Sequence, residues 1–106
     1  MAKYLIKASY TTEGAKGLLK DGGSKRRAAA EQALKSAGGK LEAFYFAFGE
    51  DDVVTIVDLP DNVAASAMSL AASATGLIRT RTTTLLTPEE VDKALGTTVR
   101  FRGAGA

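Results

Sequence analysis

The chain lacks the side chains that most enzymes use for nucleophilic catalysis and for metal binding. It contains no His and no Cys, which excludes an imidazole base, a thiolate nucleophile and a zinc-thiolate site. The usual axial ligands of haem are missing for the same reason. Any chemistry therefore falls to Asp, Glu, Lys, Arg, Tyr or Ser, or to the substrate itself, and we expect neither a cofactor nor a metal centre.

One group of polar side chains is predicted to gather on a single face of a β-sheet. The strand at residues 3–10 alternates between an apolar face, which we expect to lie against helices, and a mixed face that points away. The strand at residues 77–86 carries two arginines, and arginines on a helix-covered face would need buried partners. The open face is therefore predicted to hold the candidate ligand-binding residues Lys7, Ser9, Tyr45, Asp58, Arg79 and Arg81.

These charges in a partly apolar space suit a small anionic, enol-type or aromatic ligand. An alternative is a cofactor-independent oxygenase or isomerase. In that enzyme Lys7, Asp58 and Tyr45 would be acid, base or positioning groups, and Arg79 and Arg81 would hold developing negative charge. The same residues also suit ion pairs at a subunit interface or at the sheet rim, because ion-pair networks resemble active sites. The protein would then be a structural or regulatory assembly module.

A second candidate site lies where a helix is predicted to restart. Residues 21–27 place two glycines before a helical segment, so that backbone N–H groups could face an anion. Basic residues in the first helical turn oppose the helix dipole, and a bound phosphate would explain them. The alternative is a solvated turn with an Arg27–Glu31 pair, and the spacing is not that of a P-loop. The anion-binding candidates are Gly23, Ser24, Arg26 and Arg27.

Three consecutive acids, Glu50, Asp51 and Asp52, occupy the turn of a predicted hairpin. Adjacent carboxylates can hold a hard cation, but a dedicated calcium loop needs more ligands at wider spacing. We therefore interpret these residues as a solvated turn.

The hairpin around those acids organises the chain. Residues 41–48 and 53–59 are rich in aromatic and β-branched residues, which favour strands. Both strands are apolar on both faces, so both faces need to be covered. Helices of the same chain can cover one face, and a second copy of the chain is predicted to cover the other.

Local signals place helices between the strands. Thr12 is the predicted N-cap of a short helix, and Ser24 caps a restart that continues through residues 25–37 to a glycine pair. Asp61 or Asn62 caps the next helix, which ends at Gly76. Its predicted apolar stripe is Val63, Ala67, Leu70, Ala71 and Ala74.

The C-terminal part of the chain begins with a capping box. In Thr87-Pro88-Glu89-Glu90 the threonine and the second glutamate can satisfy each other's backbone donors, and proline suits the first helical position. The helix is predicted to end at Gly96. Residues 97–102 have strand character and could pair with a sheet edge of this chain or of a neighbour.

The resulting order is β-α-β-β-α-β with a C-terminal helix, which is the ferredoxin-like arrangement of the α+β class. A chain of 106 residues is expected to form one domain, residues 1–106. The net charge of +2 is too small to imply a nucleic-acid partner, and no apolar run approaches the ~20 residues that span a bilayer. Without a signal-peptide layout, the expected location is the cytoplasm, with no membrane partner.

Several stretches of the chain resemble the GYD-domain family. They are Tyr4–Thr11, Glu13-Gly14, Gly38-Gly39, Phe48–Val54 and Asp58–Asp61, and together they span nearly the whole chain. The sequence departs from the motif that names the family, because Asp51 stands where its tyrosine is expected. The family is similar to the dimeric α+β barrel group, in which two ferredoxin-like sheets face each other. The resemblance therefore implies a homodimer or a higher oligomer, and it implies no established reaction.

Overall fold

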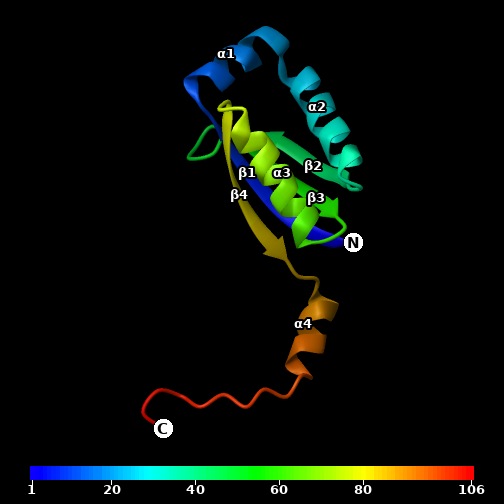
Figure 1. Ribbon diagram of the computed structural model, residues 1–106, viewed down its shortest axis with the longest axis vertical. Coiled ribbons are helices and arrows are strands. Elements are labelled where there is room, and N and C mark those ends of the chain that lie inside the picture. Colours follow the sequence, from blue (N-terminus) through cyan, green and yellow to red (C-terminus); the bar gives the residue numbers. More distant parts are fainter.

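The elements follow one another in the order that the sequence predicts. The computed structural model describes residues 1–106, and Figure 1 shows the helices and strands along the chain. Their bounds are β1 Ala2–Tyr10, α1 Thr12–Asp21, α2 Gly23–Ser36, β2 Lys40–Phe46, β3 Val53–Leu59, α3 Asn62–Ala74, β4 Ile78–Leu85 and α4 Pro88–Leu95.

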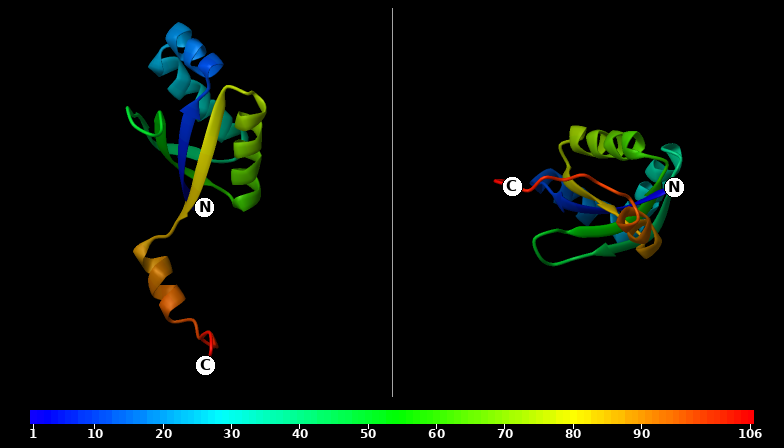
Figure 2. Two further views of the ribbon diagram at one scale, coloured as in Figure 1. Left: turned by 90° about the vertical axis from the view of Figure 1, so that its left-hand side faces the viewer. Right: turned by 90° about the horizontal axis from the view of Figure 1, so that it is seen from below.

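The four strands form one antiparallel sheet in the order β2-β3-β1-β4. This order confirms the predicted ferredoxin-like α+β fold. Helix α2 packs on β2, while α3 packs on β3 and β4. Both helices lie on the same side of the sheet, so the opposite face has no helix over it (Figure 2).

Two predicted helix caps are corrected by the structure. The N-cap of α1 is Thr11 and not Thr12, because the Thr11 hydroxyl accepts the Gly14 N–H at 3.2 Å and also donates to the Gly76 carbonyl oxygen at 2.8 Å. Helix α2 starts at Gly23 without a side-chain cap, so Ser24 does not cap it. Gly22, at a φ of 82°, both ends α1 and directly precedes α2. Ser24 therefore lies inside α2 and not at the position that caps it.

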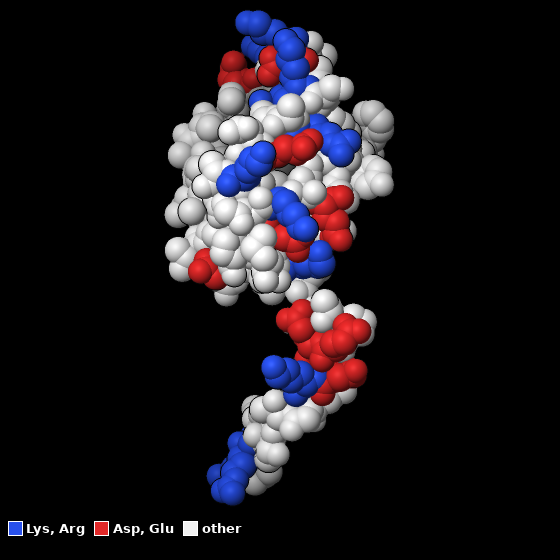
Figure 3. All heavy atoms as spheres, turned by 90° about the vertical axis from the view of Figure 1, so that its right-hand side faces the viewer, with Lys and Arg blue, Asp and Glu red and all other residues white.

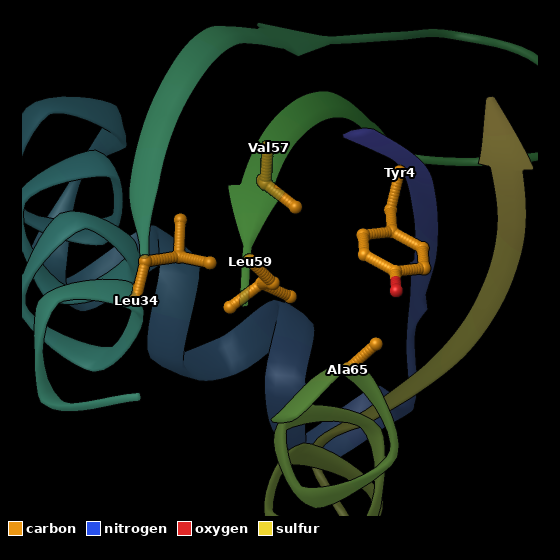
Figure 4. Packing of buried hydrophobic residues seen from close by; sticks show 5 residues of the cluster. All are labelled: Tyr4, Leu34, Val57, Leu59 and Ala65. Carbon is orange, nitrogen blue, oxygen red and sulfur yellow. The ribbon is translucent and has the colours of Figure 1, made fainter. Parts of the chain in front are cut away.

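The small core lies between the helices and the sheet, as Figure 4 shows. It consists of Tyr4, Leu34, Val57, Leu59 and Ala65. The Tyr4 hydroxyl donates to Asn62 Oδ1 at 2.6 Å, so the buried phenol has a partner. Only 10 of the 106 residues are buried, which leaves much of the helix-facing apolar surface half-covered.

The predicted apolar stripe of α3 is wrong. Val63 and Leu70 are 77% and 71% exposed, whereas Ala65 is buried and Met68 and Ala72 are half-buried against the sheet. Helix α3 is apolar around most of its circumference, so its pattern does not single out one face. Which face meets the sheet depends on where Asp61 starts the helix, through the bond that Ala64 N–H donates to its carboxylate.

The chain beyond β4 forms a C-terminal arm, residues 86–106, that points away from the sheet (Figures 1 and 2). The capping box of α4 is present as predicted, with Thr87 and Glu90 each accepting the other's backbone N–H. Residues 97–102 form no strand, which corrects the prediction of strand pairing within this chain. The arm leaves the large apolar side chains Leu86, Val91, Leu95, Val99 and Phe101 exposed.

Candidate functional site

Side chains on the open face form rows that cross the sheet from strand to strand. Each row joins residues that are register partners, and neighbouring rows lie two residues apart along a strand. Starting from the end near the β2–β3 loop, the rows are Ser9–Arg79, then Tyr45–Val54–Lys7–Arg81, then Ala43–Ile56–Leu5–Thr83, and finally Lys40–Asp58–Lys3–Leu85.

Five of the six predicted ligand-binding residues lie in two adjacent rows. They are Lys7, Ser9, Tyr45, Arg79 and Arg81. Asp58 is the exception. It pairs in register with Lys3, four residues from Lys7 along β1, which is about 13 Å at ~3.3 Å per residue. The rows therefore separate Asp58 from the two arginines.

Asp51 joins the upper rows to the β2–β3 loop. Its carboxylate lies 2.7 Å from Arg81 Nη2 and 3.9 Å from Lys7 Nζ. The Ser9 hydroxyl is 3.5 Å from the same carboxylate, at the limit of a hydrogen bond. The Asp51 side chain is only 11% exposed, and it lies within ion-pair distance of two cations of the open face.

The acidic turn is therefore not simply solvated, which corrects the prediction for two of its three residues. Asp52 accepts the Tyr10 N–H at 2.8 Å and donates its own N–H to the Ala8 carbonyl oxygen at 2.9 Å, so the loop is fastened to β1. Glu50 is the one residue of the three that is exposed. The sequence did contain a signal that an acid such as Asp51 joins this face. The predicted site held three cations but only one acid, so a further acid was needed to balance the charge.

A second ion-pair group closes the opposite end of the face. Lys3 Nζ lies 3.0 Å from an Asp58 oxygen and 3.2 Å from a Glu42 oxygen. These hydrogen bonds, the one to Asp58 first, raise the pKa of Lys3 above its ordinary value of 10.5. Asp58 is itself buried, so its carboxylate serves Lys3 and not the arginine rows.

Arg79 and Tyr45 are the predicted site residues that remain available on this face. Lys7, Arg81 and Asp58 all have acidic or basic partners within the chain, but Arg79 takes part in no ion pair. The Tyr45 side chain is 70% exposed and offers an aromatic surface. An anion would meet a free guanidinium at one end of the apolar rows.

The four residues predicted to form an anion site at the helix start have different surroundings in the structure and do not converge on one point. Arg27 Nε pairs with Glu31 at 3.4 Å, as the alternative interpretation expected, and Arg26 Nη1 lies 3.8 Å from Asp21. Ser24 is exposed. Gly23 packs beside the ring of Phe46, where a Cβ would come within 3.0 Å of a ring carbon. The structure thus directs the two arginines to separate acids.

A hollow between α2, α3 and the sheet was not predicted from the sequence. This interhelix hollow has a volume of about 410 Å³, and 16 of its 21 lining residues are hydrophobic. Its walls are alanine-rich, with Ala30 and Ala33 on α2 facing Ala72 on α3. The alanines of both helices were visible in the sequence, but the distance between the helices was not. A second, more open hollow of about 620 Å³ lies between α3 and β4.

These features define a ferredoxin-like α+β domain whose open sheet face carries an apolar row between two ion-pair groups. The family model described as GYD domain matches residues 4–95, and the chain belongs to the GYD-domain family. The resemblance seen in the sequence is confirmed. No curated protein matches the chain.

Among solved structures, the chain is similar to the crystal structure of MtbAldR. The similarity has a TM-score of 0.60 at 16% sequence identity, and it covers 99% of this chain and 57% of that chain. This chain therefore spans little more than half the length of that protein, and identity this low shows the fold alone. No helix in the structure is long and apolar enough to cross a membrane.

Proposed function

We propose that the protein is a homodimer, or a higher oligomer, that binds a small anionic or aromatic molecule between facing sheets. The observation that carries this proposal is the arrangement of the open face. Two rows with Lys7, Ser9, Tyr45, Arg79 and Arg81 adjoin an apolar row, and no helix of the chain covers them. A second copy would supply the missing cover and enclose the ligand.

The size of the open face suggests that the sheets do not make the whole interface. Four strands about 4.8 Å apart and about seven residues long cover roughly 450 Å². A stable interface of standard size buries about 800 Å² on each partner. We propose that the C-terminal arm supplies the remainder by packing on the partner subunit.

The arm has the properties of a segment that contacts another molecule. It exposes five large apolar side chains, and α4 is fully capped although it is exposed along its whole length. Figure 3 shows acids gathered on the part of the arm near the body, and basic side chains further along it. The acids Glu89, Glu90 and Asp92 could complement Arg79 of a partner's open face, which has no ion pair in its own chain. Residues 97–102 could then pair with an edge strand of that partner.

The pairing of Lys7 and Arg81 with Asp51 favours one alternative, an assembly module without a ligand. In that case the charges only fix the alignment of the two sheets. The enzymatic alternative finds less support. Asp58, the predicted base, is bound to Lys3 at the far end of the face, away from Arg79 and Arg81. We therefore propose no reaction.

The assembly is tested by sedimentation velocity over a range of protein concentrations. We expect the parent protein to sediment as a dimer or larger species. Ile56→Lys, in the apolar row, should give monomers because it places an uncompensated charge in the interface. Val63→Lys is the matched control, since Val63 is exposed on the helix side. A parent protein that is monomeric at 100 μM would overturn the proposal.

Ligand binding is tested by thermal denaturation with benzoate, 4-hydroxyphenylpyruvate and the neutral analogue benzamide. A ligand at 100 times its Kd stabilises the folded state by about 2.7 kcal/mol. We expect stabilisation by one of the two anions, none by benzamide, and loss of the effect in Arg79→Gln. A dimer that neither anion stabilises would leave the assembly module as the function.

A further inference from the structure

We infer that the interhelix hollow is a separate binding site for an amphipathic carboxylate. The apolar body of such an acid would fill the hollow, and its carboxylate would pair with Arg26. The site lies on the helix-covered face, so it is independent of the ligand proposed for the open face. It needs no second copy of the chain to complete it.

The hollow is large enough for a small molecule. It is a cleft partly open to solvent, with a volume of about 410 Å³. That volume falls in the range of about 300–1,000 Å³ that is typical of small-molecule sites. Alanines on both helices create the space, and Ile6, Phe44 and Ile78 on its floor stay only half-buried. A bound apolar molecule would cover them.

The lining residues differ between the two ends of the hollow. One end is bounded by Leu34 and Val57 of the buried core, both labelled in Figure 4. The other end lies beside Tyr10 and Arg26. Ile6 and Tyr10, both on its floor, are four residues apart in β1, which corresponds to about 13 Å. A length of this order suits a chain-like molecule with one polar end.

Arg26 is the only charged residue in the lining and determines the sign of the polar end. Its single acidic neighbour, Asp21, is 3.8 Å away, which is long for an ion pair and leaves most of the guanidinium donors unused. A planar guanidinium with free donors binds a carboxylate through two parallel hydrogen bonds. An anionic group is therefore favoured at this end, and a cation is disfavoured.

The serine and threonine side chains of the lining are already satisfied. Ser69 and Thr80 bond to each other at 2.8 Å, and Thr55 donates to the Ile6 carbonyl oxygen at 2.9 Å. Thr75 donates to the Ala72 carbonyl oxygen at 2.7 Å. Because these hydroxyls have partners, the walls favour a ligand body without polar groups of its own.

The first test is isothermal titration calorimetry of the full chain with decanoate, below the concentration at which decanoate forms micelles. We expect decanoate to bind and decyltrimethylammonium, with the opposite charge, to bind at least tenfold more weakly. Arg26→Gln should weaken decanoate binding about tenfold, because it removes a charge-assisted bond. Lys25→Gln removes the same charge from the neighbouring position outside the hollow and should bind like the parent. An equal loss in both variants would overturn the assignment of Arg26.

The second test fills the hollow from either wall. Ala30→Phe on α2 and Ala72→Leu on α3 should each abolish decanoate binding, and circular dichroism establishes that each variant is folded. Two variants are used because one larger side chain can fail to fit. Decanoate binding that persists in a folded variant, or the absence of decanoate binding to the parent, would overturn the proposal.

Discussion

The helix-covered face and the open face belong to the same four strands but hold their polar groups in different ways. On the helix-covered face the polar groups of the strands are neutral, as in the bonds from Tyr4 to Asn62 and from Thr55 to the Ile6 carbonyl. On the open face they are mainly ionic and cluster around Asp51 and around Lys3. One face is an interior with space left in it, while the other has the composition of an interface.

This difference indicates where each face is incomplete. The helix-covered face lacks side-chain volume, because the alanines of the two helices are too small to fill the space above the sheet. The open face lacks cover, since Leu5 and Ile56 lie in an apolar row that is only half-buried in the single chain. A small molecule can fill the hollow on the helix-covered face. The open face needs another protein surface of similar size to cover it.

The largest effect is expected from a matched pair of leucine truncations, one on each face. Leu59→Ala removes a fully buried side chain from the core and should lower the free energy of unfolding by about 3 kcal/mol. Leu5→Ala should cost about 1 kcal/mol in the isolated protomer, because Leu5 is only half-buried there. Urea unfolding at low protein concentration measures both. Equal losses in the dilute protomer would show that the two faces are covered alike.

An intermediate effect is expected from the ion pairs of the open face. Asp51→Asn leaves Lys7 and Arg81 without their shared acid and should lower the free energy of unfolding by about 1 kcal/mol, since Arg81 is largely exposed. Glu50→Gln, one residue earlier and exposed, is the control and should have no effect. Salt screens the pair, so the difference from the parent should shrink in 1 M NaCl. A difference that salt leaves unchanged would argue against an electrostatic role for Asp51.

The smallest effect is expected at alkaline pH. Because Asp58 and Glu42 raise the pKa of Lys3 in the folded state, the stabilisation is complete below pH 10.5 and is lost as the pH rises through the folded-state pKa. The difference in unfolding free energy between the parent and Lys3→Met should therefore be constant below pH 10.5 and decrease above it. Lys16→Met, in an exposed pair with Glu13, serves as the control. A difference that grows with pH would contradict the assignment.

Features fixed by local rules were predictable from the sequence. Alternation placed Lys7 and Ser9 opposite the buried Tyr4, and the need to keep arginines unburied placed Arg79 and Arg81 on the same face. The capping box at Thr87 followed from residue types and spacing alone. Strand order followed from the connection pattern.

Features that depend on contacts between distant elements were not predictable. Thr11 and Thr12 are equally good caps until Thr11 is seen to meet the loop at Gly76. The burial of Asp51 depends on how far the hairpin loop reaches over the sheet, and α3 is too uniformly apolar to reveal its inner face. The interhelix hollow depends on the spacing of two helices, which no local pattern encodes.

The central position of β1 has a consequence for how the chain is made. Tyr10 pairs with Ile78, a partner 68 positions later (78 − 10), so one long side of β1 stays unpaired until the last strand leaves the ribosome. At about 5–20 residues per second that wait lasts roughly 3–14 s. During it, Lys3 and Lys7 discourage nascent chains from adding strands to one another, since lysine on a bare strand edge opposes such pairing. The same lysines that later meet Asp58 and Asp51 therefore protect the unfinished sheet.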